Sequence, residues 1–293
     1  MVDASTKLVG LLGWPLQHSF SPGMHNAAFD ALGLNWRYLP FPVSPDKLED
    51  AFRGLLAAGI QGLNVTIPHK QTVISQLSSL EDSASQLGAV NTIKVDSSSG
   101  SEIITRGYNT DVVGFINALK EAHFGSHKGK SAVVIGAGGA ARAVVSGLIQ
   151  EGFSKITVLN RNVERGQALV ETFCQYTCRM EALPLTTGHL IDCTSSDSLL
   201  VNSTPVGTWP ESDYSVWPDQ IPIPSGLTVF DLVYNPPMTK LLRQGRDSGA
   251  AIISGLEMLI YQGAQSFHIW TGLPAPVEVM RKACQTIIGG KNV

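Results

Sequence analysis

The chain has 293 residues, of which 43% are hydrophobic and 15% charged, and its formal net charge is -3. The length suggests two domains, and this composition is sufficient for ordinary buried cores. With a pI of about 6.2 the chain has no broad positive field, so neither nucleic acid nor an anionic membrane is an expected partner.

Targeting, disulfide and metal signals are weak. The longest apolar runs are strand-sized, below the roughly 20 residues of a membrane helix, and residues 1–7 contain no secretory hydrophobic region. A cytoplasmic location is therefore expected.

The cysteines lack paired C-x-x-C spacing, and no histidine or carboxylate cluster accompanies them; they are Cys174, Cys178, Cys193 and Cys284. We expect neither a disulfide framework nor a metal site.

The N-terminal part of the chain alternates between strand and helix patterns. Strands are predicted at 8–13, 36–41 and 62–67, and helices over 24–32 and 45–58. This is a βαβαβ order, typical of an α/β domain.

A hairpin pattern follows. The turn residues 96–100 separate predicted strands at 89–95 and 102–108, after which Thr110 is expected to cap a helix that continues to about His123.

The most informative segment, 133–141, is an apolar strand that runs into a glycine turn and then a helix. Gly136 allows the tight turn, Gly138 lets the backbone approach a pyrophosphate, and Ala141 packs the helix on the strand. The helix is predicted to start near Ala140, so its unpaired N–H groups and positive dipole end would face the phosphates. The segment predicts a dinucleotide site.

The next predicted strand, 155–160, indicates which dinucleotide. It ends in Asn160 and Arg161 instead of an acid that would bind the ribose hydroxyl of NAD. Arg161 and Arg165, one helical turn apart, offer two guanidinium groups to the 2′-phosphate of NADP. The alternative is that both arginines are solvated residues at a helix start. We predict NADP(H) as the cofactor.

The remaining patterns complete a doubly wound, Rossmann-type domain. Its further strands are predicted at 180–185, 199–204, 228–232 and 250–253. The proline-rich segment 204–224 is expected to be a surface loop beside the cofactor. Helices predicted over 256–270 and 276–288 have no strand left to pair with, so they are expected to return to the first domain. The predicted division is 1–111 plus 255–293 for the substrate domain and 112–254 for the nucleotide domain.

Polar residues gather outside the nucleotide domain at 18–22, 64–70 and 107–111. Ser19 and Ser21, two apart in a segment expected to be extended, would point the same way and hold the two oxygens of one carboxylate. Helix capping by Ser21 is the alternative. Lys70 follows a strand and a proline, where an ammonium would be held rigidly, although a lone lysine is more often solvated.

These segments resemble motifs of the shikimate dehydrogenase family over nearly the whole chain. The matching stretches are H-S-x-S-P at 18–22, N-V-T-x-P-x-K at 64–70, G-A-V-N-T at 88–92, G-x-N-T-D at 107–111 and G-A-G-G-A at 136–140. Tyr234 and Gln262 match a late tyrosine and glutamine of the family. The resemblance implies reversible reduction of 3-dehydroshikimate to shikimate by NADPH, a step in the biosynthesis of aromatic amino acids.

The resemblance also implies roles for single residues. Lys70 and Asp111 would be the catalytic pair, in which the ammonium stabilises the developing charge on the ketone oxygen and donates a proton. A purely structural ion pair is the alternative. Implied substrate-binding residues are Ser19, Ser21, Thr66, Asn91, Tyr234 and Gln262. Predicted cofactor-binding residues are Gly136, Ala137, Gly138, Gly139, Ala140, Asn160, Arg161, Arg165, Thr204 and Gly255.

Two positions depart from the family pattern: Asn162 stands where threonine is common, and Thr208 where methionine is common.

Other functions stay open, namely a quinate/shikimate dehydrogenase of broader specificity, a non-catalytic NADPH-binding sensor and a methyltransferase with a similar glycine turn. Ser21 favours shikimate over quinate, and the arginines after the second strand argue against the methyltransferase. The expected partner is a small molecule, and the chain is expected to be a monomer or homodimer.

Overall fold

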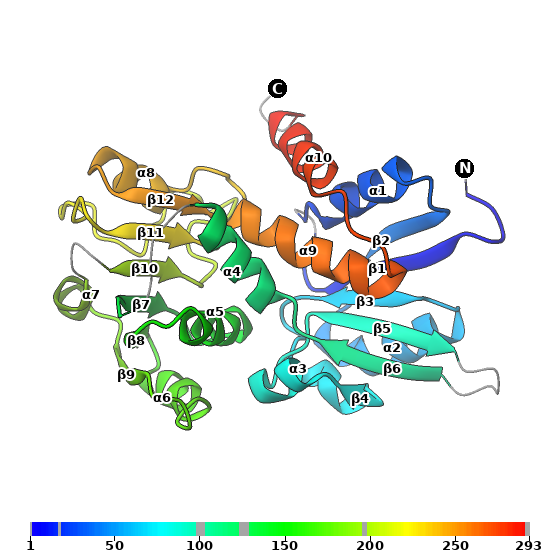
Figure 1. Ribbon diagram of the computed structural model, residues 1–293, viewed down its shortest axis with the longest axis horizontal. Coiled ribbons are helices and arrows are strands. Elements are labelled where there is room, and N and C mark those ends of the chain that lie inside the picture. The colour runs from blue at the N-terminus through cyan, green and yellow to red at the C-terminus, as the bar shows by residue number, and fades with distance from the viewer. Residues whose placement is uncertain (1, 17–18, 98–102, 123–128, 195–197, 291–293) are drawn as a thin grey trace. The chain divides into compact units, whose positions relative to one another are not determined.

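The computed structural model describes residues 2–16, 19–97, 103–122, 129–194 and 198–290 (Figure 1). The chain forms two compact units, Met1–Thr110 with Ile260–Val293, and Asp111–Leu259. The chain returns from the second unit to the first within helix α9 (Gly255–Thr271). No change in sequence composition marks this boundary. Among the described residues, no helix has the length and apolar character needed to cross a membrane.

The first unit contains a six-stranded sheet in the order β2-β1-β3-β5-β6-β4. Its first half is parallel, whereas β5 runs antiparallel to both β3 and β6. The strands are β1 (Lys7–Gly13), β2 (Trp36–Pro42), β3 (Gly62–Val65), β4 (Ser79–Leu80), β5 (Thr92–Ser97) and β6 (Ile103–Tyr108). The predicted βαβαβ order is confirmed, and the hairpin turn at 98–102 lies outside the described residues.

Helices of the first unit follow the predicted pattern with short additions. They are α1 (Ser21–Ala31), the 3₁₀ turn η1 (Pro45–Lys47), α2 (Leu48–Ala57), η2 (Thr72–Gln76), α3 (Asp82–Leu87) and α10 (Val277–Gly290). The short elements β4, η2 and α3 lack a long apolar repeat, so the sequence did not predict them. The strand expected over 89–95 begins only at Thr92, because the N–H of Val90 donates to the carbonyl of Lys70 at 2.8 Å.

Aromatic rings join helix α9 to the first sheet. Phe267 of α9 stacks on Phe29 of α1 with ring centroids 5.1 Å apart. Trp270, one turn further on, donates its indole N–H to the carbonyl of Ile93 in β5 at 2.9 Å. These contacts fix the part of α9 that carries Gln262 and Ser266 against the strands of the first unit.

The second unit contains a parallel six-stranded sheet in the order β12-β11-β10-β7-β8-β9, which confirms the doubly wound prediction. Its strands are β7 (Ser131–Ile135), β8 (Lys155–Asn160), β9 (Arg179–Pro184), β10 (Leu199–Asn202), β11 (Thr228–Asp231) and β12 (Ala251–Ser254). Its helices, besides the start of α9, are α4 (Asp111–Glu121), α5 (Gly139–Gln150), α6 (Val163–Glu171), α7 (Thr187–Cys193) and α8 (Lys240–Asp247). His123, where the helix after Thr110 was expected to end, lies outside the described residues.

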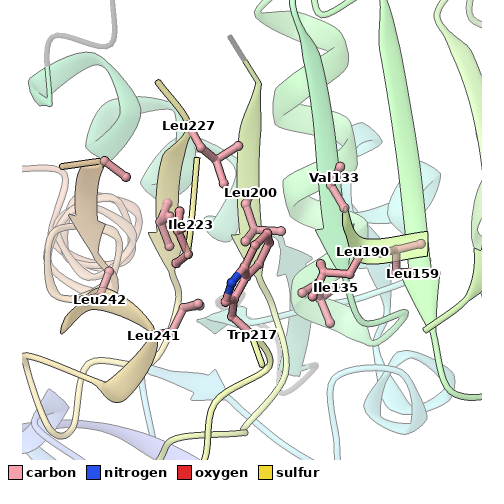
Figure 2. Close-up of a cluster of buried hydrophobic side chains, with 12 residues drawn as sticks. Val133, Ile135, Leu159, Leu190, Leu200, Trp217, Ile223, Leu227, Leu241 and Leu242 are labelled. Carbon is pink, nitrogen blue, oxygen red and sulfur yellow. The ribbon is translucent and has the colours of Figure 1, made fainter. Parts of the chain in front are cut away.

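Both faces of this sheet are covered, as its continuous apolar strands require. On one face, Phe115 of α4 stacks on Phe230 of β11 with centroids 5.2 Å apart. On the other, side chains of α7 and α8 pack against alternate strand residues (Figure 2).

The loop between β10 and β11 contributes to this second face. Trp217 and Ile223 are each only 2% exposed and belong to the cluster in Figure 2. The expectation of a surface loop over 204–224 is therefore wrong for this part, because these two side chains fill core space in a connection that has no helix.

Candidate active site

The predicted site residues divide between the two units. The first unit contains Ser19, Ser21, Thr66, Lys70, Asn91 and Gln262, and the second contains Asp111, Tyr234 and the predicted cofactor-binding residues. His18 of the first motif lies outside the described residues. No group of three or more metal-binding side chains occurs in the described part of the chain.

Ser19 and Ser21 lie at the start of α1, but not in the expected geometry. Phe20 between them has helical dihedrals (φ -86°, ψ -13°), so the segment is not extended. The hydroxyl of Ser19 accepts the N–H of Ser21 at 3.3 Å, and Ser21 is the first helical residue instead of the cap. Both hydroxyls therefore occupy the end of an 11-residue helix, where free N–H groups favour a carboxylate.

Thr66 and Lys70 lie in a tight turn after β3. The N–H of Thr66 donates to Leu12 of β1 at 2.9 Å, and the carbonyl of Thr66 accepts the N–H of His69 at 2.9 Å. The carbonyl of Lys70 then accepts from Val90 at 2.8 Å. The backbone that carries the lysine is thus bonded to the segment before β5.

Asn91 and Gln262 are brought together although they lie 171 positions apart in the sequence. The Asn91 side chain is buried, and its Oδ1 accepts the N–H of Thr110 at 2.8 Å. Its Nδ2 donates to the hydroxyl of Thr110 at 2.9 Å and to Oε1 of Gln262 at 3.4 Å. Two predicted substrate-binding amides therefore form one hydrogen-bonded group.

Asp111 is the first residue of α4 and is only 5% exposed. An acidic side chain in the first turn is favoured by the positive end of the helix dipole. The division between the two units passes between Thr110 and Asp111.

The glycine turn after β7 has the features of a phosphate cradle. Gly136 has φ +108°, and a Cβ there would lie 2.6 Å from the hydroxyl of Ser203, so the turn itself requires glycine. Gly138 is extended, and a Cβ there would meet nothing within 4 Å. Helix α5 begins at Gly139, as predicted, so the open space lies over a helix N-terminus. This space fits the pyrophosphate of a dinucleotide.

Arg161 and Arg165 are both exposed and flank the start of α6. Asn162 caps this helix, because its Oδ1 accepts the N–H of Arg165 at 2.8 Å. Asn160 at the end of β8 donates to the carbonyl of Asn162 at 2.7 Å. Asn162, which departs from the family threonine, thus caps the helix, and both arginines are exposed at its start.

A buried carboxylate connects the two loops that carry Thr204 and Tyr234. Asp231 at the end of β11 accepts hydrogen bonds from Asn202 at 2.9 Å, the N–H of Val233 at 3.1 Å and Thr239 at 2.6 Å. Asn202 in turn accepts from the N–H and hydroxyl of Thr204 at 3.1 and 2.7 Å. Burial raises the pKa of the Asp231 carboxyl to about 6.

Gly255 lies against the same loop. A Cβ at this position would overlap the carbonyl of Leu232, so the start of α9 needs glycine for close backbone packing. Asp231 was not among the predicted site residues, although an acid at the end of a fully buried strand is a signal that could have identified it.

Family models match most of the chain. Residues 11–93 match a shikimate dehydrogenase substrate binding domain, residues 118–214 a shikimate/quinate 5-dehydrogenase, and residues 255–285 a shikimate 5'-dehydrogenase C-terminal domain.

Relatives and solved structures agree over almost the full length. The shikimate dehydrogenase (NADP(+)) of Methanopyrus kandleri is 45% identical over 96% of this chain and 96% of its own. A crystal structure of a shikimate dehydrogenase in complex with NADP+ has a TM-score of 0.87 and 39% identity, and covers 98% of both chains. A quinate dehydrogenase from Corynebacterium glutamicum in complex with NAD has a TM-score of 0.85 and 31% identity, with 96% of this chain and 99% of that chain covered.

Proposed function

This chain belongs to the shikimate dehydrogenase family, and from that membership we propose that it catalyses the reversible NADP(H)-dependent reduction of 3-dehydroshikimate to shikimate. The observation that carries the proposal is the Asn91–Gln262 hydrogen bond, which brings two predicted substrate-binding amides together in the same unit as Lys70. In the family this reaction is a step in the biosynthesis of aromatic amino acids.

Substrate recognition would use two kinds of group. Ser19 and Ser21 at the start of α1 would bind the carboxylate, since hydroxyls and a helix N-terminus both donate to anions. Thr66, Asn91 and Gln262 would bind ring hydroxyls. Tyr234, in the loop that Asp231 supports, would also bind the substrate.

Lys70 and Asp111 would perform the proton chemistry. When bound, NADP(H) supplies or accepts the hydride. As the ketone carbon is reduced, negative charge develops on its oxygen, which the Lys70 ammonium stabilises and protonates. Asp111 would hold the ammonium and accept a hydrogen bond from a substrate hydroxyl.

Cofactor binding would rest on the open glycine turn and the two arginines. The pyrophosphate would lie over Gly138 at the N-terminus of α5, and Gly136, Ala137, Gly139 and Ala140 would complete that turn. The exposed guanidinium groups of Arg161 and Arg165 would pair with the 2′-phosphate, which only NADP carries. Thr204 and Gly255 would lie near the nicotinamide end.

The direct test is to mix the protein with shikimate and NADP⁺ and follow NADPH formation by its near-ultraviolet absorbance. Folded protein that binds NADPH but gives no NADPH formation would contradict the proposal and favour a non-catalytic sensor. The structural similarity to a quinate dehydrogenase makes broader specificity the second candidate. Comparing kcat/KM for shikimate and quinate, each with NADP⁺ and NAD⁺, separates the two.

Localisation and assembly belong to the same proposal. We place the enzyme in the cytoplasm as a monomer or homodimer, acting on a small-molecule substrate. Gel filtration of the purified protein over a range of concentrations tests the assembly state, and cell fractionation tests the location.

A further inference from the structure

Six buried polar side chains, Asn91 among them, form a continuous hydrogen-bonded cluster that contacts Gln262. All six are at most 5% exposed. They come from strands and helices far apart in the sequence and are, in chain order, Tyr38, Asn64, Asn91, Thr92, Thr110 and Ser266. We refer to them as the amide cluster. Burial of so many polar groups is tolerable only when their hydrogen bonds are satisfied.

A backbone N–H group fixes the orientation of the Asn91 amide. The backbone N–H of Thr110 can only donate, and it lies 2.8 Å from Oδ1 of Asn91. The oxygen of the Asn91 amide is therefore the end held inside the cluster. Its Nδ2 must face the hydroxyl of Thr110 and Oε1 of Gln262. Gln262 therefore turns its oxygen toward Asn91.

Ser266 connects the helix that carries Gln262 to the strands that carry Asn91. Its hydroxyl donates to the carbonyl of Gln262, one turn earlier on α9, at 2.9 Å. Its oxygen then accepts from Nδ2 of Asn64 at 3.0 Å and lies 2.8 Å from the hydroxyl of Thr92. The Thr92 hydroxyl also lies 3.1 Å from Oδ1 of Asn91. The Ser266 hydroxyl therefore links the backbone of Gln262 to the side chain of Asn91 through Thr92.

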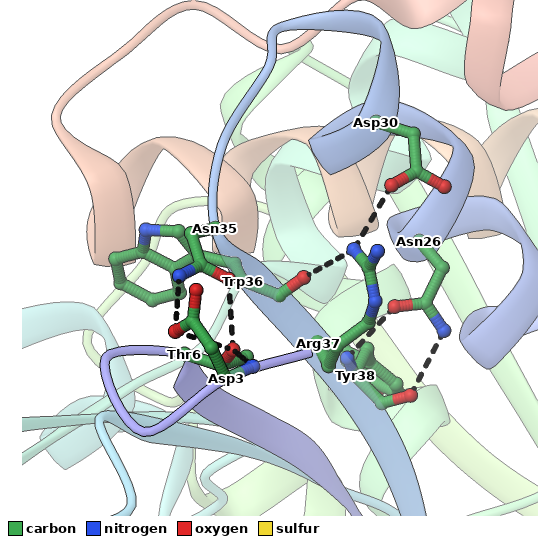
Figure 3. Close-up of polar contacts among 8 residues, drawn as sticks. All are labelled: Asp3, Thr6, Asn26, Asp30, Asn35, Trp36, Arg37 and Tyr38. Atoms are coloured by element: carbon green, nitrogen blue, oxygen red, sulfur yellow. Dashed lines mark hydrogen bonds and ion pairs between the residues drawn. The ribbon is translucent and has the colours of Figure 1, made fainter. Parts of the chain in front are cut away.

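The other end of the cluster is fixed by Tyr38. Its phenol donates to Oδ1 of Asn64 at 2.9 Å. Nδ2 of Asn64 donates to the carbonyl of Asn91 at 3.1 Å, and because a carbonyl can only accept, this bond fixes the orientation of the Asn64 amide with its Nδ2 toward Ser266. The backbone of Tyr38 is clamped by the side chain of Asn26 through two bonds of 2.8 and 3.0 Å, as Figure 3 shows. The chain of fixed directions thus runs from Asn26 on α1 to Ser266 on α9.

We propose that Ser266 is a positioning residue for substrate binding, which holds Asn91 and Gln262 in their mutually hydrogen-bonded arrangement. This inference rests on the proposed function. Its consequence is that loss of the Ser266 hydroxyl should weaken shikimate binding and leave NADP⁺ binding unchanged. Ser266 itself need not touch the substrate.

The test compares two cluster variants with a matched control. Ser266→Ala and Thr92→Val each remove one cluster hydroxyl. Thr271→Ala is the control, because Thr271 makes the same bond to the residue four positions earlier on α9, to Phe267 at 2.8 Å, outside the amide cluster. For each variant we would measure KM for shikimate, KM for NADP⁺, kcat and Tm.

The cluster variants are expected to raise KM for shikimate by about 3- to 10-fold, the effect of one net hydrogen bond. KM for NADP⁺ should stay within about twofold, whereas the control should leave both constants at the wild-type value. An unchanged KM for shikimate in the cluster variants, or equal rises for shikimate and NADP⁺, would overturn the inference. If Ser266→Ala does not fold, Thr92→Val decides alone. Wild-type protein that neither binds nor oxidises shikimate would instead refute the proposed function, and the inference with it.

Discussion

Lys70 is the residue whose chemistry is easiest to separate from folding. Its backbone is fixed by the bonds that join the turn after β3 to Val90, and these bonds do not involve its ammonium. These backbone bonds can form with any other side chain at this position. A change in kcat of a Lys70 variant would therefore report on the chemical role of the ammonium.

Lys70→Met keeps most of the side-chain stem and removes the charge and the proton. We expect kcat to fall by about 10²- to 10⁴-fold, the usual contribution of a positioned acid or base. KM for shikimate should change far less, because the loss is specific to the transition state. Steady-state kinetics with shikimate and NADP⁺ provide the measurement, with Lys47→Met on the exposed turn η1 as control. A purely structural role for Lys70 would show as lower Tm with kcat largely retained.

Single residues also show where prediction from sequence reached its limit. Asn91 and Gln262 were identified only through family motifs, because nothing in their local sequence reveals that they meet. Ser266 follows Gln262 by one helical turn and reads as an ordinary core position. Its role depends on hydrogen bonds to Asn64 and Thr92, and such long-range contacts have no local signature.

At the scale of elements, the glycine turn before α5 contains two glycines that the structure distinguishes. Gly136 has positive φ and no room for a side chain beside Ser203. Gly138 has an ordinary extended conformation and open space around it. Steric contacts within the fold therefore explain glycine at the first position only, and the proposed binding of a pyrophosphate would explain it at the second.

Gly138→Ala is expected to leave Tm within about 2 °C of wild type and to raise KM for NADP⁺ by about tenfold or more, since the added methyl would occupy the space proposed for the pyrophosphate. Gly136→Ala should instead lower the free energy of unfolding by about 1–3 kcal/mol through strain and overlap. Thermal unfolding and steady-state kinetics of the two variants test this. Equal effects of both substitutions on Tm would show that Gly138 is structural.

Elements with a long apolar repeat or a strong end signal were predicted well. The second sheet, the glycine turn and the start of α5 near Gly139 follow from apolar strands and small residues. The short elements around 72–87 and the buried Trp217 were not predicted, since their environment is supplied by tertiary packing. The helical backbone at Phe20 was also missed, because two serines around an aromatic residue are compatible with either conformation.

Across the whole molecule, two buried groups make stability depend on pH in opposite directions. His25 in the first unit is completely buried and stacks on Tyr38 with ring centroids 4.5 Å apart. Neither ring nitrogen has a hydrogen-bond partner among the described residues. Burial lowers the pKa of this imidazole from 6.5 to about 3. Asp231 in the second unit has its pKa raised from 3.8 to about 6.

His25 should destabilise the fold under acidic conditions. Between pH 6.5 and about 3 the unfolded chain binds a proton at His25 that the folded chain does not, so stability falls as pH falls. The limiting slope is about 1.4 kcal/mol per pH unit. In His25→Phe this slope should be absent, so the variant should gain stability relative to wild type as pH drops from 7 to 5. Urea unfolding at several pH values measures the free energy of unfolding of both proteins. If the difference between variant and wild type does not change with pH, His25 is not buried as a neutral imidazole.

Asp231 should act in the opposite sense. Its stabilising contribution is fully present below pH 3.8, where the carboxyl is protonated in both states, and is lost as pH rises through about 6, because the folded state then buries a charge. Asp231→Asn cannot ionise, so its stability relative to wild type should rise by about 3 kcal/mol between pH 4 and 7 and stay constant above. Any fixed cost of the altered bond to Thr239 cancels in this difference. Urea unfolding at several pH values provides the measurement, and Asp213→Asn, which changes an exposed carboxylate of the same unit, is the control. A difference independent of pH would mean that the hydrogen bonds to Asp231 balance the effect of burial on its pKa.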